Sequence, residues 1–254
     1  MRGTKIMIAL AALALAPAAM AQEAPGEPQQ VLAVFAHPDD ELFMAPALAA
    51  LARQGAKVTI FHATRGDAGP GVSGLRKGTE LAKRRSAEAY CAVLARGVWS
   101  HAIAEHGDGK LAEDAHGEDS FARILTDQLE QRLSDVDLIL TWGPDGGYGH
   151  ADHRIVSALT TQAVQALPAA ERPKLLYVGI PSGSLPPVPE MAAWATTDPA
   201  LLTESIAYTP ADLAAATAAA ACHVTQFDEA SRQGMMGLFD ATMWRGKVHF
   251  RPAF

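Results

Sequence analysis

The stretch that decides the fold is residues 31–41, which read Val-Leu-Ala-Val-Phe-Ala-His-Pro-Asp-Asp-Glu. Its first half is an apolar run without polar alternation, which is typical of a strand buried on both faces of a parallel sheet. An imidazole and three carboxylates then follow at once. Charged groups rarely stand beside a buried strand unless they are paired or bind a metal. His37 and Asp40 can therefore reach one cation, while Asp39 stays free to move a proton.

Apolar runs of the same kind recur along the chain and alternate with helix-like segments. Further strands are expected at residues 57–63, 97–104, 136–141 and 175–180. Helices are expected at residues 46–54, 79–95, 121–133, 152–167 and 212–223. This alternation predicts a Rossmann-like, three-layer α/β domain with a mostly parallel sheet. Residues 181–189 predict a loop, the tail from Phe239 is expected to pack back on the domain, and the role of the region from Met191 is left open.

The first residues are typical of an export signal that does not belong to the fold. Arg2 and Lys5 precede an apolar stretch at 6–16, and Ala-Met-Ala at 19–21 fits a small-residue cleavage site. A membrane anchor is the alternative, but the run is short for a bilayer span and Pro17 interrupts its end. We expect cleavage, no membrane insertion afterwards, and a periplasmic or secreted protein.

The predicted domain organisation follows from this leader. We expect a signal peptide at 1–21, a flexible lead-in at 22–30 and a single α/β domain at 31–254, which is long enough to bury a substantial core. The formal net charge is −7, and loss of the two leader cations makes it −9. An acidic protein is a poor partner for nucleic acid, whose phosphates require basic patches. Oligomeric state cannot be predicted from these features.

Two cysteines, Cys91 and Cys222, lie in alanine-rich, helix-like stretches. In an oxidising compartment they could form one disulfide. Two separate buried thiols are the alternative, because a sequence does not say whether the two Cα atoms come within bonding range. Both interpretations stay open.

Several polar loops follow the predicted strands directly. They are residues 37–41, 64–67, the loop at Asp108, and 143–153. In a parallel sheet, the loops beyond the carboxyl ends of the strands lie at one edge, where ligands bind. We therefore expect these four loops to share one rim.

The last of these loops is the second dense stretch of the chain. Residues 142–153 are rich in glycine and end in His-Ala-Asp-His at the opening of a helix. His150 and His153 stand three positions apart and can share a helix face. A histidine from here, with the His/Asp pair of 37–41, supplies three ligands and leaves an open position, as a catalytic zinc site requires.

These two loops resemble the PIG-L/LmbE-like family of zinc-dependent N-deacetylases. Members have a Rossmann-like fold and remove acetyl groups, mostly from N-acetylglucosamine-type sugars. Four shorter stretches also resemble family motifs, at residues 64–69, 85–88, 108–111 and 223–226. Asp67 replaces the glutamate usual in the first, and Thr225 stands in place of serine in the last. The resemblance runs from about Val31 to Gln226.

The resemblance implies a ligand set and a general base. His37, Asp40 and His153 would bind Zn²⁺, although nitrogen and oxygen ligands also accept Fe²⁺. Asp39 would take the proton of a zinc-activated water as that water attacks the amide carbonyl.

Two further residues of the second loop receive roles from the same resemblance. His150 would stabilise the oxyanion as an imidazolium and protonate the leaving amine. Asp152 would orient His150 or another histidine as an outer hydrogen-bond partner. Glu41 is expected to cap the following helix or to brace a ligand, and histidines outside these motifs are expected to be structural or solvated.

The predicted substrate contacts come from several loops. Arg65, Asp67, Arg85 and Asp108 could hydrogen-bond sugar hydroxyls, and Tyr148 could close over the substrate. The alternatives are structural: Arg85 could tie a helix to a loop through a carboxylate, and Tyr148 could be a packing aromatic.

Together these features predict an exported metal-dependent hydrolase that removes an acetyl group from an N-acetylated amino sugar or glycoconjugate. Its partner would be a small-molecule or oligosaccharide substrate. The alternatives are a metal-dependent esterase or amidase for another substrate, which would use the same oxyanion chemistry, and a non-catalytic saccharide-binding protein. The exact sugar and the native metal are not readable from the sequence.

Overall fold

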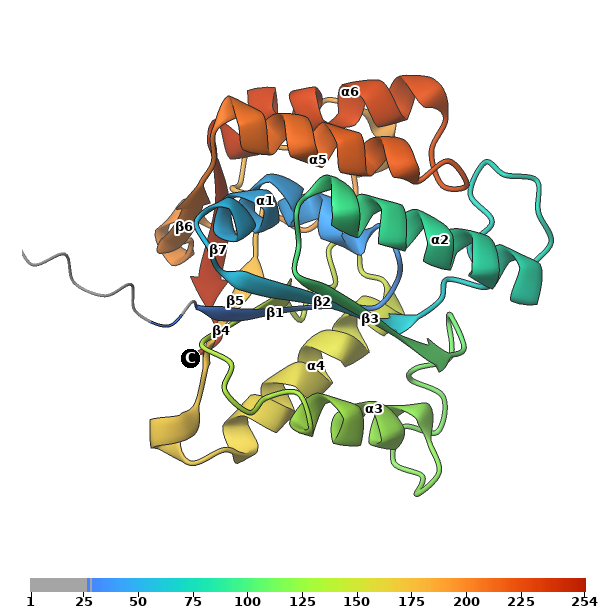
Figure 1. Ribbon diagram of the computed structural model, residues 1–254, viewed down its shortest axis with the longest axis vertical. Coiled ribbons are helices and arrows are strands. Elements are labelled where there is room, and N and C mark those ends of the chain that lie inside the picture. Colours follow the sequence, from blue (N-terminus) through green and yellow to red (C-terminus); the bar gives the residue numbers. More distant parts are fainter. Residues whose placement is uncertain (1–26, 28) are drawn as a thin grey trace, which may run out of the picture.

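The computed structural model of the protein describes residue 27 and residues 29–254, which form one sheet with helices on both faces (Figure 1). The predicted signal peptide at 1–21 lies outside the described residues, as does most of the predicted lead-in at 22–30. No helix in the described part of the chain is long and apolar enough to cross a membrane. The division into signal peptide, lead-in and domain stays a prediction.

The described strands are β1 Gln30–Phe35, β2 Lys57–Thr64, β3 Ser100–His106, β4 Leu138–Trp142, β5 Lys174–Val178, β6 Glu204–Ala207 and β7 Lys247–Pro252. Within the described residues they form one seven-stranded sheet in the order β3-β2-β1-β4-β5-β7-β6. β1 to β5 pair in parallel, whereas β7 is antiparallel to both of its neighbours. The predicted Rossmann-like fold with a mostly parallel sheet is confirmed.

Helices cover both faces of this sheet. Their bounds are α1 Ala45–Arg53, α2 Thr79–Ala95, α3 Phe121–Glu130, α4 Ala151–Ala166, α5 Pro210–Cys222 and α6 Glu229–Phe239. Figure 1 shows α3 and α4 on one face and α1 and α2 on the other, with α5 and α6 packed outside α1 and α2. A 3₁₀-helical turn at Asp40–Met44 leads from the loop after β1 into α1.

The residues of β1 explain why the strand is apolar at every position. Val31, Ala33 and Phe35 belong to the core shared with α1, whereas Leu32 and Val34 belong to the core shared with α3 and α4. None of these five side chains is more than 2% exposed. Such a strand is stable only when a helical layer covers each face of the sheet.

The third strand begins later than predicted. We expected a strand at 97–104, but β3 spans Ser100–His106. Gly97 has a φ of +66°, and its N–H donates to the carbonyl oxygen of Leu94. Residues 96–98 therefore form the turn that ends α2, at a left-handed position that favours glycine.

The region after β5 adds an antiparallel edge that the sequence analysis did not predict. β7 returns along β5 with Phe250 opposite Val178, and the short β6 completes the edge. The tail from Phe239 thus packs back on the domain as expected, but it does so as a strand. In β7 the buried Val248 and Phe250 alternate with less buried polar residues, the pattern of a strand with one core-facing side.

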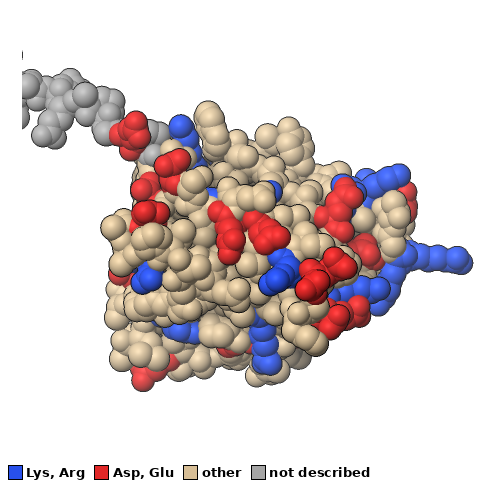
Figure 2. Space-filling view, turned by 90° about the horizontal axis from the view of Figure 1, so that it is seen from below, with Lys and Arg blue, Asp and Glu red and all other residues tan. Residues whose placement is uncertain are grey.

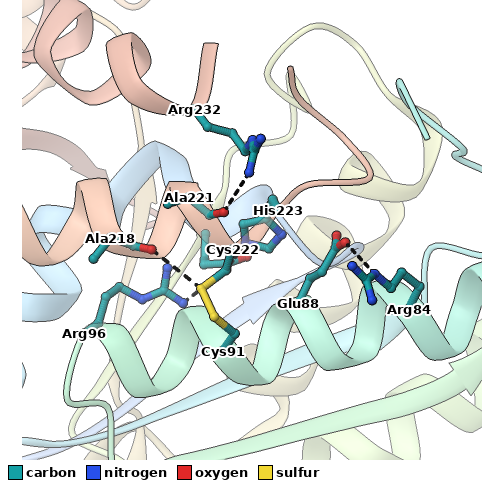
Figure 3. The surroundings of a disulfide bond; sticks show 10 residues. Arg84, Glu88, Cys91, Arg96, Ala218, Ala221, Cys222, His223 and Arg232 are labelled. Carbon is teal, nitrogen blue, oxygen red and sulfur yellow. Dashed lines mark hydrogen bonds and ion pairs between the residues drawn. A yellow bond between two sulfur atoms is a disulfide. The ribbon is translucent and has the colours of Figure 1, made fainter. Parts of the chain in front are cut away.

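A disulfide joins Cys91 in α2 to Cys222 at the end of α5, with the two Cα atoms 5.8 Å apart (Figure 3). The sequence had left this bond open against two separate thiols. Because the cysteines are 131 positions apart, the bond closes a long loop, and such a cross-link restricts the unfolded chain strongly. It fastens the C-terminal helices to the N-terminal half of the domain.

The side of the molecule covered by α3 and α4 carries mixed charges. Figure 2 shows acidic and basic side chains interspersed among uncharged ones on this face. Nucleic acid binding draws instead on clustered basic side chains. The expectation that nucleic acid is no partner stays a prediction.

Candidate active site

The loops after β1 and β4 meet at the carboxyl edge of the sheet. β1 and β4 are direct neighbours, while β2 and β3 lie on the other side of β1. This reversal of strand order is the place where open α/β sheets bind ligands. The expected convergence is found here, since His37 Nδ1 lies 3.2 Å from His153 Nε2 across 116 positions of sequence.

Three side chains place their donor atoms around a common point. His153 Nε2 lies 2.9 Å from Asp40 Oδ1, and His37 Nδ1 lies 3.7 Å from Asp40 Oδ2. A tetrahedral zinc ion with ligands at about 2.1 Å separates its ligand atoms by roughly 3.4 Å. The three predicted ligands therefore lie together, buried, at spacings that fit one divalent cation.

In both imidazoles, the ring nitrogen that points away from the three donor atoms faces a hydrogen-bond acceptor. His37 Nε2 lies 3.1 Å from Asp108 Oδ1 and 3.3 Å from Asp152 Oδ2. His153 Nδ1 lies 3.1 Å from the carbonyl oxygen of Gly146. With the ring protons on these outer nitrogens, Nδ1 of His37 and Nε2 of His153 would have lone pairs free to bind a cation. Histidines that bind metals are held in this way.

The charges around the three donor atoms favour a cation. Burial lowers the pKa of His37, but hydrogen bonds to Asp108, Asp152 and Asp40 outweigh it and raise the pKa well above its ordinary value. Burial opposes ionisation of Asp40, yet His153 and His37 hold the pKa of this carboxyl well below its usual range. The site therefore keeps its carboxylate ionised and stabilises positive charge between the imidazoles.

Two other groups of residues in the described chain could also hold a metal ion, and both include His37. One adds His150 and His153, and the other adds Asp108 and Asp152. The second group uses Nε2 of His37, and its carboxylates already accept backbone N–H groups. We favour the Nδ1 side, where the lone pairs of two imidazoles and an Asp40 oxygen face one another.

Asp39 stands at the entrance of the 3₁₀ turn with a φ of +106°. Glu41 Oε2 accepts its backbone N–H at 2.9 Å, and Arg85 Nη2 lies 3.2 Å from its Oδ1. Burial raises the pKa of Asp39, and the charge of Asp40 adds to this while Arg85 opposes it. A left-handed backbone is rare outside glycine, and the contacts with Glu41 and Arg85 hold Asp39 in it. Asp39 lines the same cavity as Asp40 and His153.

His150 caps the N-terminus of α4. Its Nδ1 accepts the N–H of Asp152 at 3.2 Å, so a proton on the ring belongs at Nε2. Its ring lies edge-on to His37, with centroids 4.7 Å apart. Burial, together with the nearby histidines, lowers the pKa of His150. This arrangement favours a neutral ring that donates from Nε2 over the expected imidazolium. Asp152 contacts the ring of His37 and reaches His150 through its backbone.

Arg85 lies buried behind the site. Its guanidinium donates to the carbonyl oxygens of Pro38, Gly66 and Gly69 and pairs with Asp39. An added Cβ at Gly66 would meet this guanidinium, which explains the glycine there. Arg85 thus ties α2 to the loops after β1 and β2, and its contact with a sugar hydroxyl stays a prediction.

Of the other predicted substrate contacts, some join loops of the site to one another and some lie nearer the surface. Asp67 Oδ1 accepts the N–H of Asp108 at 3.0 Å, so these residues join the loops after β2 and β3. Arg65 pairs with Glu105 near the surface. Tyr148 is 49% exposed and lines the cavity described below. Substrate contacts by these residues stay predictions.

A buried ionic network under the site was not predicted. Glu41 Oε1 lies 3.1 Å from Arg96 Nη2 and 3.2 Å from His223 Nε2, and Oε2 lies 3.1 Å from His62 Nε2. Burial raises the pKa of Glu41, but Arg96 and the histidines outweigh it and hold the pKa well below its usual range. The partners come from β2, from the end of α2 and from beyond α5, so no local spacing could have indicated them.

A cavity of about 710 Å³ opens beside the three donor atoms. Asp39, Asp40 and His153 line one end of it. Aromatic and aliphatic side chains from the loop after β5 and from α6 line much of the remainder. The candidate chemistry therefore lies at the polar end of a largely apolar cavity.

The fold and the site define a Rossmann-like α/β protein with candidate metal-site residues at the carboxyl ends of β1 and β4. The chain belongs to the PIG-L family, because the family model described as GlcNAc-PI de-N-acetylase matches residues 32–164, just over half of the chain. The match includes every candidate ligand and catalytic residue named above. Residues 165–254 lie outside it.

Curated relatives agree with this assignment. A 1D-myo-inositol 2-acetamido-2-deoxy-alpha-D-glucopyranoside deacetylase from Kineococcus radiotolerans is 33% identical over 164 residues, which are 54% of this chain and 45% of the relative. The chain spans about half the length of the curated relatives it matches.

Two solved structures illustrate the shared fold. N,N'-diacetylchitobiose deacetylase from Pyrococcus horikoshii has a TM-score of 0.64 at 19% identity, with 89% of this chain and 84% of that chain covered. The 4-carboxy-2-hydroxymuconate hydratase GalB from Pseudomonas putida has a TM-score of 0.61 at 15% identity, with 89% and 96% covered. Because proteins with two different reactions share this fold, the function has to be argued from the site.

Proposed function

We propose that this protein is an exported, zinc-dependent hydrolase that removes the acetyl group from an N-acetylated amino sugar or glycoconjugate. The observation that carries the proposal is the cluster of donor atoms from His37, Asp40 and His153, with the carboxylate of Asp39 beside it. Membership of the PIG-L family and the deacetylase named among the relatives support the substrate class.

Each residue has a role that its contacts support. His37, Asp40 and His153 would hold a divalent ion, which would supply a Lewis acid for the amide carbonyl and lower the pKa of water towards ~7. Asp39 accepts the proton of the attacking water and passes a proton to the amine nitrogen as the C–N bond breaks, and Arg85 and Glu41 hold Asp39 in place. His150 donates from Nε2 to the oxygen that becomes negative during the attack, which is the role of an oxyanion-hole donor.

The test of this activity is acetate release. Metal-loaded protein is incubated with N-acetylglucosamine and with N,N'-diacetylchitobiose, and acetate is measured against protein treated with a chelator. We expect release that requires the metal. Release from O-acetyl esters but from no acetamido sugar would identify an esterase, and saturable sugar binding without any turnover would identify a binding protein.

Metal identity is tested separately from activity. Protein purified anaerobically without added metal is analysed by elemental mass spectrometry, and we expect about one zinc per chain. A preparation that contains iron instead, and loses activity in air, would replace zinc with Fe²⁺ in the proposal.

The disulfide between Cys91 and Cys222 supports export, because such bonds persist in oxidising compartments. Fractionation of the producing cells followed by mass spectrometry of the intact protein tests this. We expect a periplasmic or secreted chain that begins near Gln22. An uncleaved chain in the cytosol, with both thiols reduced, would contradict the export.

A further inference from the structure

An aromatic surface leads from the metal-site residues into the cavity. Trp142 stacks on His153 with ring centroids 5.3 Å apart. Phe43 contacts Trp142 at 4.9 Å and Phe239 at 5.2 Å, and it stacks on Trp194 at 4.3 Å. These four aromatic side chains and His153 line one cavity, and we call the four together the aromatic wall.

Several apolar side chains of this cavity are only partly buried. They are Val188, Trp194, Phe227, Met235 and Leu238. Partly exposed apolar side chains gathered in one concavity mark a ligand site, because single exposed apolar residues are usually scattered. A ligand that covers these apolar side chains must itself be apolar where it contacts them.

The wall is held in place by the loop that carries the candidate catalytic residues. Ala195 donates its N–H to the carbonyl oxygen of Gly147 at 2.8 Å. A Cβ added at Gly147 would lie 3.1 Å from the rings of both Trp142 and Trp194. The backbone at Gly147 therefore packs against both indoles, which leaves no room for a side chain there.

The polar groups of the cavity are too few for a second sugar ring. Apart from the metal-site residues and Asp39, the polar side chains that line it are Tyr148, Glu190 and Ser231, and the last two are exposed. A sugar residue presents several hydroxyl groups, each of which needs a partner when water is removed. The wall suits hydrocarbon better than an oligosaccharide.

We infer that the substrate carries an apolar group, an aryl ring or an alkyl chain, which binds between α6 and the loop after β5 while the amide lies at the metal-site residues. The volume of about 710 Å³ is in the range of sites for whole small molecules, far more than an acetyl group needs. This inference rests on the proposed function, since it names the substrate of the same site. The apolar group belongs either to an aglycone on the amino sugar or to an N-acyl chain longer than acetyl, in which case the hydrolase would release that longer acid in place of acetate.

Two substrate series separate these sources. The first compares N-acetyl-, N-hexanoyl- and N-octanoylglucosamine, and the second compares methyl, phenyl and octyl glycosides of N-acetylglucosamine, with amine release as the measurement. We expect kcat/KM to rise by about tenfold or more in one series, since each buried methylene adds to binding. A rise in the first series assigns the cavity to the acyl chain, and a rise in the second assigns it to the aglycone. Equal values throughout, or a preference for N,N'-diacetylchitobiose, overturn the inference while leaving the deacetylase proposal intact.

Variants test the wall directly. Met235→Gln and Trp194→Ala should abolish most of the preference for the apolar substrate. Trp99→Ala is the matched control, because Trp99 is 70% exposed and precedes β3 at the amino edge of the sheet. A preference that survives in both cavity variants contradicts the inference, and circular dichroism shows whether each variant is folded.

A binding measurement keeps the inference testable if no amide is cleaved. Hexyl and methyl β-D-glucopyranoside have no amide, and their binding is measured by titration calorimetry. We expect the hexyl compound to bind at least about tenfold more tightly, and Met235→Gln to remove the difference. If no amide is cleaved but the hexyl glucoside still binds more tightly, only the proposed function is refuted. Equal binding of the two glucosides refutes the apolar site.

Discussion

Two regions meet at the candidate active site, and they are built differently. The loops at 37–41 and 143–153 come directly after neighbouring parallel strands and supply imidazoles and carboxylates. The region at 181–254 supplies a loop, two helices and an antiparallel edge, and it contributes apolar side chains to the same cavity. The family match includes the first region and excludes the second. The difference indicates that the reaction is encoded locally at strand ends, whereas the shape of the cavity depends on packing between distant segments.

The largest expected effect tests the first region. Asp39→Asn removes the proposed base but keeps its shape, so we expect turnover to fall by about 10²–10⁴-fold while metal content stays unchanged. Steady-state kinetics and elemental analysis of the same sample measure both. Asp119→Asn, at an exposed position, is the control. Full activity of Asp39→Asn would show that the local loops do not hold the base.

A second substitution tests whether the first region depends on residues outside it. Glu41→Gln leaves Arg96 without its carboxylate, although both side chains are fully buried. Breaking such a pair costs about 3–5 kcal/mol, and we expect that loss in the free energy of unfolding by urea titration. Glu130→Gln, at an exposed position, should change it by less than about 0.5 kcal/mol. Equal stability of the two variants would mean that the network does not support the site.

The disulfide connects the two halves covalently. We expect Cys91→Ser combined with Cys222→Ser to lower the free energy of unfolding by about 2–5 kcal/mol, because the bond closes a loop of well over a hundred residues. The same loss should appear when the native protein is reduced, and the double variant should not respond to reductant. Two titratable thiols in the untreated, folded protein would contradict the bond.

The smallest expected effect concerns an ion pair between α1 and the second region. Arg53 of α1 lies 2.8 Å from Asp212, which also completes the N-terminal cap of α5. Asp212→Ala should cost about 1 kcal/mol at neutral pH through the lost cap. Burial raises the pKa of Asp212, but hydrogen bonds from Arg53 and Thr209 outweigh it and lower the pKa.

The pH dependence of this pair has a definite sign. Because the folded-state pKa of Asp212 is lowered, its contribution is present above the unfolded pKa of about 3.9 and is lost as pH falls through the lower, folded value. The stability difference between the native protein and Asp212→Ala should therefore shrink in acid. A difference that grows as pH falls would contradict the assignment.

The parallel part of the fold could be predicted because its signals are local. β1 is apolar at each position from Val31 onward, and the boundaries of α2 agree with the prediction at 79–95. The three predicted ligands lie together because neighbouring parallel strands end at one edge. These are consequences of short stretches and of strand direction, both of which a sequence contains.

The rest depends on which distant segments touch. β7 pairs with β5 after a gap of nearly seventy residues, and β6 has four residues, so neither has a strong local pattern. Glu41 meets Arg96, His62 and His223 only in the folded chain. Arg85 illustrates the same limit, since its motif could not say whether it faces a sugar or the backbone carbonyls that it contacts.

The most direct test is a crystal structure of the zinc-loaded protein with anomalous scattering recorded on both sides of the zinc edge. We expect one zinc peak within about 2.0–2.2 Å of His37 Nδ1, an Asp40 carboxylate oxygen and His153 Nε2, with Asp39 outside the coordination sphere. A peak on the Nε2 side of His37, between Asp108 and Asp152, or no peak at this edge of the sheet, would contradict the account.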